Sequence, residues 1–136
     1  MRETQDDSLV QGTSSRVAEY LATNSGLSLE EFCEGLRARQ NLPPFQYDSE
    51  DDDPYAWADL PHIRINVSRP ARPETLQDWM PNTPSGSTFQ IILLVAEDAL
   101  CERPPDWTKT VVLPKFITAI EEMTGCPVTH YSTSSR

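Results

Sequence analysis

The stretch from Phe89 to Ala96 constrains the fold of this chain more than any other part. Its sequence, FQIILLVA, is apolar at nearly every position and has the length of a strand. A run this apolar is typical of a strand whose two faces are both covered. We therefore predict a central strand at residues 89–96. A chain of 136 residues is long enough to bury one modest core around such a strand.

A helix and a second strand are predicted after this stretch. Residues 114–125 place apolar side chains at helical spacing, and Gly125 favours the left-handed conformation that ends a helix. Residues 128–133 are predicted to form the next strand. If both strands belong to one sheet, the connection through the helix makes them parallel. Residues 89–133 are thus predicted as a β-α-β unit in a small mixed or parallel sheet.

The N-terminal region is predicted to form a helical hairpin over residues 14–41, after a flexible tail at residues 1–13. In the first helix, Val17, Tyr20 and Leu21 form an apolar stripe at positions i, i+3 and i+4. A stripe of this kind covers one face of a helix. We expect the hairpin to pack on the sheet through that face.

The second helix of this hairpin has the sharpest local signal in the chain. Ser28 and Glu31 have the spacing of a capping box, in which each residue satisfies a backbone N–H of the other. Leu27 and Phe32 are placed to make the apolar contact that accompanies such a box. The helix is predicted to run to about Gln40, because two prolines follow soon after.

The composition changes at residues 42–61. The sequence from Asp48 to Pro61, DSEDDDPYAWADLP, combines a run of carboxylates with prolines and spaced aromatic residues. Like charges repel one another along the chain, and the prolines oppose a helix. We therefore predict an exposed acidic linker at residues 42–61.

Residues 62–133 are predicted to form the α/β core. The alternation of Ile63, Ile65 and Val67 with polar residues indicates a half-buried strand. Residues 73–80 are predicted to form a short helix that begins with a proline. The fold class expected for the whole chain is α+β in one domain, with α/β as the alternative.

The charge of the chain limits its partners. Eleven basic and 21 acidic residues give a net charge of −10. A surface of this sign repels nucleic acid and anionic membranes and favours basic protein partners. No apolar run is long enough for a membrane helix, and the N-terminus is polar and acidic, without the apolar part of a secretion signal. We expect a cytoplasmic or nuclear protein that is not secreted.

The acidic segment contains a candidate docking motif. Trp57 and Leu60, preceded by acidic residues, resemble the acidic W-x-x-L motif by which eukaryotic proteins bind ubiquitin-like autophagy modifiers. The resemblance implies that Trp57 and Leu60 are the two anchors that enter pockets of the partner. Tyr55 adds a further aromatic contact, and Asp51, Asp52 and Asp53 would steer the partner. Alternatively, these aromatic residues fold onto the domain itself.

Ser49 is a candidate phosphorylation site. Glu50, Asp51 and Asp52 follow it, and this order resembles the sites of acid-directed kinases. A phosphate on Ser49 would add roughly −1.5 to −2 charges to an acidic segment.

Motifs for catalysis or metal binding are missing from the sequence. Two histidines and three widely spaced cysteines offer no paired metal ligands, and no glycine-rich phosphate loop is present. We predict no catalytic residue, no metal site and no cofactor. The alternative is a small enzyme or nucleotide-binding domain with its site at the carboxyl edge of the sheet. Glu97, Asp98 and His130 are the candidates there.

These observations favour a protein-interaction module that is not an enzyme. It would bind a protein partner that is basic or has an apolar groove, through the acidic aromatic segment or a face of the sheet. Regulatory, inhibitory and adaptor roles all fit, including the role of a viral or pathogen accessory protein.

Overall fold

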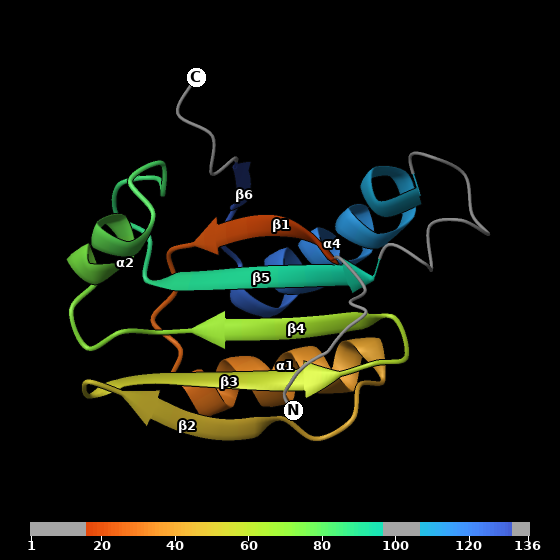
Figure 1. The fold of residues 1–136 in the computed structure, drawn as a ribbon, viewed down its shortest axis with the longest axis horizontal. Helices are drawn as coiled ribbons and strands as arrows, with labels where there is room; N and C mark the ends of the chain where they lie inside the picture. The colour runs from red at the N-terminus through yellow and green to blue at the C-terminus, as the bar shows by residue number, and fades with distance from the viewer. Residues whose placement is uncertain (1–15, 97–106, 132–136) are drawn as a thin grey trace, which may run out of the picture.

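The computed structural model describes residues 16–96 and 107–131, which form one six-stranded sheet with helices on one of its faces (Figure 1). The strands are β1 (Arg16–Thr23), β2 (Gln46–Glu50), β3 (Asp53–Asp59), β4 (Ile63–Ser68), β5 (Phe89–Ala96) and β6 (Val128–Tyr131). The helices are α1 (Leu29–Gln40), α2 (Glu74–Trp79) and α4 (Leu113–Thr124), with a π-helical turn, η1 (Thr108–Val112), directly before α4. The predicted tail at residues 1–13 lies outside the described residues.

The sheet has the order β2-β3-β4-β5-β1-β6, and every neighbouring pair is antiparallel. The predicted parallel or mixed sheet is therefore wrong. β5 and β6 flank β1 and do not pair with each other, so the connection through α4 crosses over one strand (Figure 1). The sequence after β5 correctly predicts a helix and a strand. That part of the sequence does not indicate that the N-terminal segment, as β1, lies between the two strands.

The predicted N-terminal helical hairpin is also wrong, because its first half is strand β1. Tyr20 pairs with Ile92 on one side and with Tyr131 on the other. The apolar spacing of Val17, Tyr20 and Leu21 suits a helix locally. Hydrogen bonding to two neighbouring strands, together with the burial of Leu21, Ala22 and Thr23 between them, favours the strand instead.

Residues 46–59, predicted as part of an exposed linker, form the hairpin of β2 and β3. Asp51 and Asp52 occupy the turn with φ angles of 53° and 67°. A two-residue turn with both φ angles positive matches the twist of a hairpin, and aspartate tolerates this conformation better than most residues. The carboxylates point into solvent on an edge strand, so their repulsion does not prevent pairing.

The second predicted helix is confirmed as α1, together with its capping box. The Ser28 hydroxyl accepts a hydrogen bond from the Glu31 N–H at 3.0 Å, and Glu31 Oε1 accepts one from the Ser28 N–H at 2.8 Å. Asn41 closes the helix in the left-handed conformation, with φ at 55°. The strand at β5 and the helices at α2 and α4 also lie where the sequence predicts them.

Replacing Ser28 with alanine is expected to lower the free energy of unfolding by about 1 kcal/mol, because the first turn of α1 loses its side-chain acceptor. Urea denaturation followed by tryptophan fluorescence measures this change. Ser28→Asp keeps an acceptor at the cap and should retain most of the stability. An equal loss in both variants would contradict a capping role for this residue.

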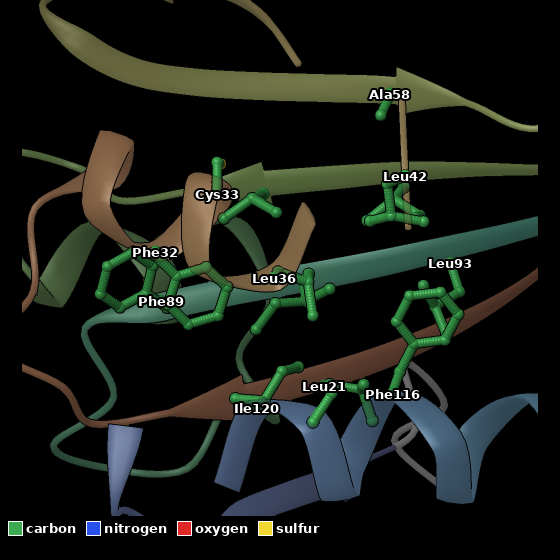
Figure 2. Close-up of a cluster of buried hydrophobic side chains, with 14 of the residues drawn as sticks. Leu21, Phe32, Cys33, Leu36, Leu42, Ala58, Phe89, Leu93, Phe116 and Ile120 are labelled. Carbon is green, nitrogen blue, oxygen red and sulfur yellow. The ribbon is translucent and has the colours of Figure 1, made fainter. Parts of the chain in front are cut away.

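The core lies between the sheet and the two long helices. Figure 2 shows Phe32 of α1 beside Phe89 of β5, and Phe116 and Ile120 of α4 under the same sheet. Phe32 and Phe89 are both fully buried, and their rings stack with centroids 4.3 Å apart. Gly35 lets α1 and α4 approach each other, because a Cβ atom there would collide with the side chain of Met123.

Candidate functional site

In residues 16–96 and 107–131, the helices that cross the sheet lie on one of its two faces. α1 and α4 both lie behind the sheet in Figure 1, and α2 sits at one end of the strands. Within the described residues, no helix crosses the opposite side. We call this side the open face. Its side chains alternate along each strand with those that enter the core.

The strand registers place these side chains in two rows across the open face. One row consists of Asp48, Tyr55, Ser68 and Gln90, taken from β2 to β5. The next row consists of Gln46, Trp57, Asn66, Ile92 and Tyr20, taken from β2 to β1. Directly opposed side chains on one face are close enough to form a continuous surface.

A pocket of about 430 Å³ lies on the part of the open face nearest α2. It is lined by the aromatic rings of Tyr55, Trp57 and Trp79 and by the carboxylates of Glu50 and Asp53, among others. Trp79 is the last residue of α2, and 45% of its surface is exposed. A pocket of this volume lies within the range that takes small ligands or single side chains of a partner.

Tyr55 and Trp57 form an aromatic platform within the pocket. Their rings stack with centroids 5.8 Å apart and planes 28° apart. The Arg64 guanidinium lies over the Trp57 ring, 6.0 Å from its centroid. Asp59 holds that guanidinium through two hydrogen bonds of 2.7 and 2.9 Å, which also raise the pKa of Arg64. The positive charge nearest the platform is therefore already paired.

The other side of the platform is acidic. Desolvation and the charges of Asp48 and Glu50 raise the pKa of Tyr55 above its ordinary value. Asp53 pairs with Glu50 across the hairpin turn, which places two carboxylates side by side. One oxygen of Asp53 accepts a hydrogen bond from the Ala71 N–H at 3.0 Å. An added cation would thus meet unbalanced negative charge at this end of the pocket.

The structure brings some of the predicted docking residues together and separates others. Tyr55, Trp57 and Asp53 line the pocket, whereas Asp51 and Asp52 lie at the exposed hairpin turn. Leu60 is partly buried and packs against the core. Trp57 and Leu60 therefore do not share one docking surface in this structure. β3 also pairs along both edges, so its backbone is not free to add to a partner's sheet.

Ser49, the candidate phosphorylation site, lies on the exposed edge strand β2. It pairs with Pro54 and therefore points to the side of the sheet opposite Tyr55. Its N–H donates a hydrogen bond to the Asp48 side chain at 2.7 Å. The residue is exposed, so its place in the fold is compatible with modification.

Several residues of the open face were not identified from the sequence. Arg64 and Asn66 could have been found, because they are the outward positions of a strand whose inward positions were recognised. Trp79 could not, since the sequence of a short helix does not show which strands it approaches. Gln90 could not be identified either, because the sequence around it shows only an apolar run.

Of the residues predicted for the alternative site at the carboxyl edge of the sheet, the structure describes His130. Glu97 and Asp98 lie outside the described residues. His130 lies on β6, where its ring nitrogen is 2.8 Å from a carboxylate oxygen of Glu19. Among residues 16–96 and 107–131, no group of three or more His, Cys, Asp and Glu side chains could hold a metal ion.

The Cys33 thiol is fully buried beneath the sheet. Burial raises the pKa of this thiol from 9.0 to about 12, an effect that a hydrogen bond with Tyr47 opposes and the charge of Glu34 reinforces. A thiol that stays protonated in an apolar environment is a poor nucleophile. We therefore assign Cys33 to the core.

Alkaline pH is expected to destabilise the wild-type protein in part through Cys33. The folded state holds the thiol proton more tightly than the unfolded chain, so stability falls as pH rises from about 9 towards 12. Urea denaturation at pH 8, 9 and 10 should show a steeper decline for wild type than for Cys33→Ala. Equal slopes for the two proteins would contradict this coupling.

Comparisons with protein-family models, curated proteins and solved structures gave no match. In the part of the chain that the structure describes, no helix combines the length and apolarity needed to cross a membrane.

Proposed function

We propose that this chain is a protein-interaction module that binds a basic segment of a partner protein across its open face. The observation that carries the proposal is the pocket near α2, where aromatic rings and carboxylates meet on the open face. Aromatic side chains supply contact area at low entropic cost, and carboxylates select partners by charge.

The charge of the whole chain supports the same choice of partner. A net charge of −10 attracts basic segments over distances of about a Debye length and repels acidic ones. The acidic turn at Asp51 and Asp52 extends this field beyond the edge of the pocket. Such steering raises the rate of association, while the aromatic residues hold the complex together.

Selection from a random library of 12-residue peptides, with the full chain as bait, tests this function. Enriched peptides should carry net positive charge, and their affinity should fall as ionic strength rises. In nuclear magnetic resonance spectra, they should shift the backbone amides of β3, β4 and β5 and leave those of α1 and α4 in place. Enrichment of neutral or acidic peptides, or shifts confined to the helices, would overturn the proposal.

A further inference from the structure

We infer that the pocket bounded by Glu50, Asp53, Tyr55, Trp57 and Trp79 receives the guanidinium group of an arginine side chain. This inference rests on the proposed function and names the partner residue that the pocket recognises. Arg64, which lines the same pocket, already holds a guanidinium against the aromatic platform.

Arg64 shows how this platform accepts a guanidinium. Its planar group lies over the Trp57 ring while two of its N–H groups donate to the two carboxylate oxygens of Asp59. A flat cation is thus held by an aromatic face and by a two-oxygen acceptor at once. This combination is the preferred mode of arginine, because its donors lie in one rigid plane.

The Tyr55 end of the platform offers the same two elements. Tyr55 stacks on Trp57 with the two planes 28° apart and lines the same pocket. Glu50 and Asp53 are opposed across the turn of the hairpin and line the same pocket. One oxygen of Asp53 is engaged by Ala71, which leaves the carboxylate of Glu50 as the main acceptor for an incoming cation.

Trp79 makes this part of the open face a pocket. It comes from α2, and almost half of its surface remains accessible. An arginine side chain entering here would place its methylene groups against Trp79 and its charged head over Tyr55. Long basic side chains commonly bury their apolar stems in this way.

Arginine fits these contacts better than the alternatives do. A lysine ammonium is compact and strongly hydrated, and it cannot stack as a plane on the nearly parallel rings. A nucleotide could stack there, but its phosphate would approach Glu50 and Asp53, which repel it. The carboxylates and the stacked platform together therefore select a planar cation.

The test uses the full chain labelled with nitrogen-15 and three peptides of the form acetyl-Gly-X-Gly-amide, where X is arginine, lysine or citrulline. The arginine peptide should shift the indole N–H signals of Trp57 and Trp79. Trp107, which packs against the core elsewhere, should not respond. Citrulline keeps the shape of arginine without its charge and should bind roughly 5-fold more weakly or not at all.

Glu50→Gln removes the carboxylate that is proposed to accept the guanidinium. It should weaken binding of the arginine peptide roughly 3-fold or more, as expected for loss of one charge-assisted contact. Glu122→Gln makes the same change of charge on the exposed side of α4 and should leave binding as in wild type. Preserved amide spectra in both variants confirm that the fold is intact.

The outcomes separate this inference from the proposed function. Equal binding of citrulline or lysine, or an unaffected Glu50→Gln variant, would overturn the arginine pocket. A uridine monophosphate probe that shifts the same two indoles more strongly would overturn it as well. If library selection still returns basic peptides that bind the open face, the proposed function survives such a result. Neutral or acidic selected peptides would refute that function whatever the tripeptides do.

Discussion

Phe32→Ala is expected to lower the free energy of unfolding by about 3–5 kcal/mol. Phe32 is fully buried at the centre of the helix–sheet interface, and its ring stacks on Phe89 at a centroid distance of 4.3 Å. Alanine would leave a cavity between α1 and β5 that the surrounding side chains cannot fill without moving the helix. Because a domain of this size has a total stability of about 5–15 kcal/mol, the variant should lose a large fraction of its stability.

Equilibrium urea denaturation, followed by tryptophan fluorescence, gives the loss directly. Phe32→Leu keeps most of the apolar volume but not the ring stack, so it should lie between wild type and Phe32→Ala. Val111→Ala removes methyl groups from a side chain that is 50% exposed and should change stability by no more than about 0.5 kcal/mol. A Phe32→Ala protein as stable as the Val111→Ala control would show that this interface is not the core.

Local signals in the sequence predict individual elements well. The capping box at Ser28 and Glu31, the apolar run of β5 and the helical spacing of α4 all describe short-range preferences. The structure keeps these preferences because nothing in the rest of the fold opposes them. Such elements can be predicted without knowing their neighbours.

The arrangement of the strands cannot be predicted in the same way. Val17, Tyr20 and Leu21 have helical spacing, yet they form β1 because β5 and β6 offer hydrogen-bonding partners on both sides. The acidic hairpin is a similar case, since pairing between β2 and β3 is invisible in a sequence dominated by charge and proline. In both places, contacts between distant segments decide the conformation.

Residues of the candidate site divide in the same way, because those on one strand can be predicted from the sequence and those from another element cannot. Tyr55, Trp57 and Asp53 stand out in the sequence as an aromatic and acidic cluster, and the structure places them in one pocket. The sequence also groups Leu60 with them, because the motif ignores which face of the chain each residue occupies. Trp79 completes the pocket from a different element, so only the fold reveals it.

Trp57→Ala is expected to weaken binding of a basic peptide by about 2 kcal/mol or more, which is roughly 30-fold in the dissociation constant. Trp57 lines the pocket on the open face, where its ring stacks with Tyr55 and lies under the paired Arg64. Its removal takes away the aromatic surface on which a partner would rest. Isothermal titration calorimetry with a peptide selected on the wild-type chain measures the change.

The substitution alters no charge, so it distinguishes binding at the open face from general attraction to an acidic protein. Trp57→Phe keeps an aromatic ring and should recover a large part of the affinity. Val111→Ala, on η1, should bind as wild type does. If Trp57→Ala retained full affinity, or if Val111→Ala lost as much, the peptide would be held by the net charge of −10 rather than by this surface. Because aromatic contact does not depend on salt while charge attraction does, the gap between wild type and Trp57→Ala should persist at high ionic strength.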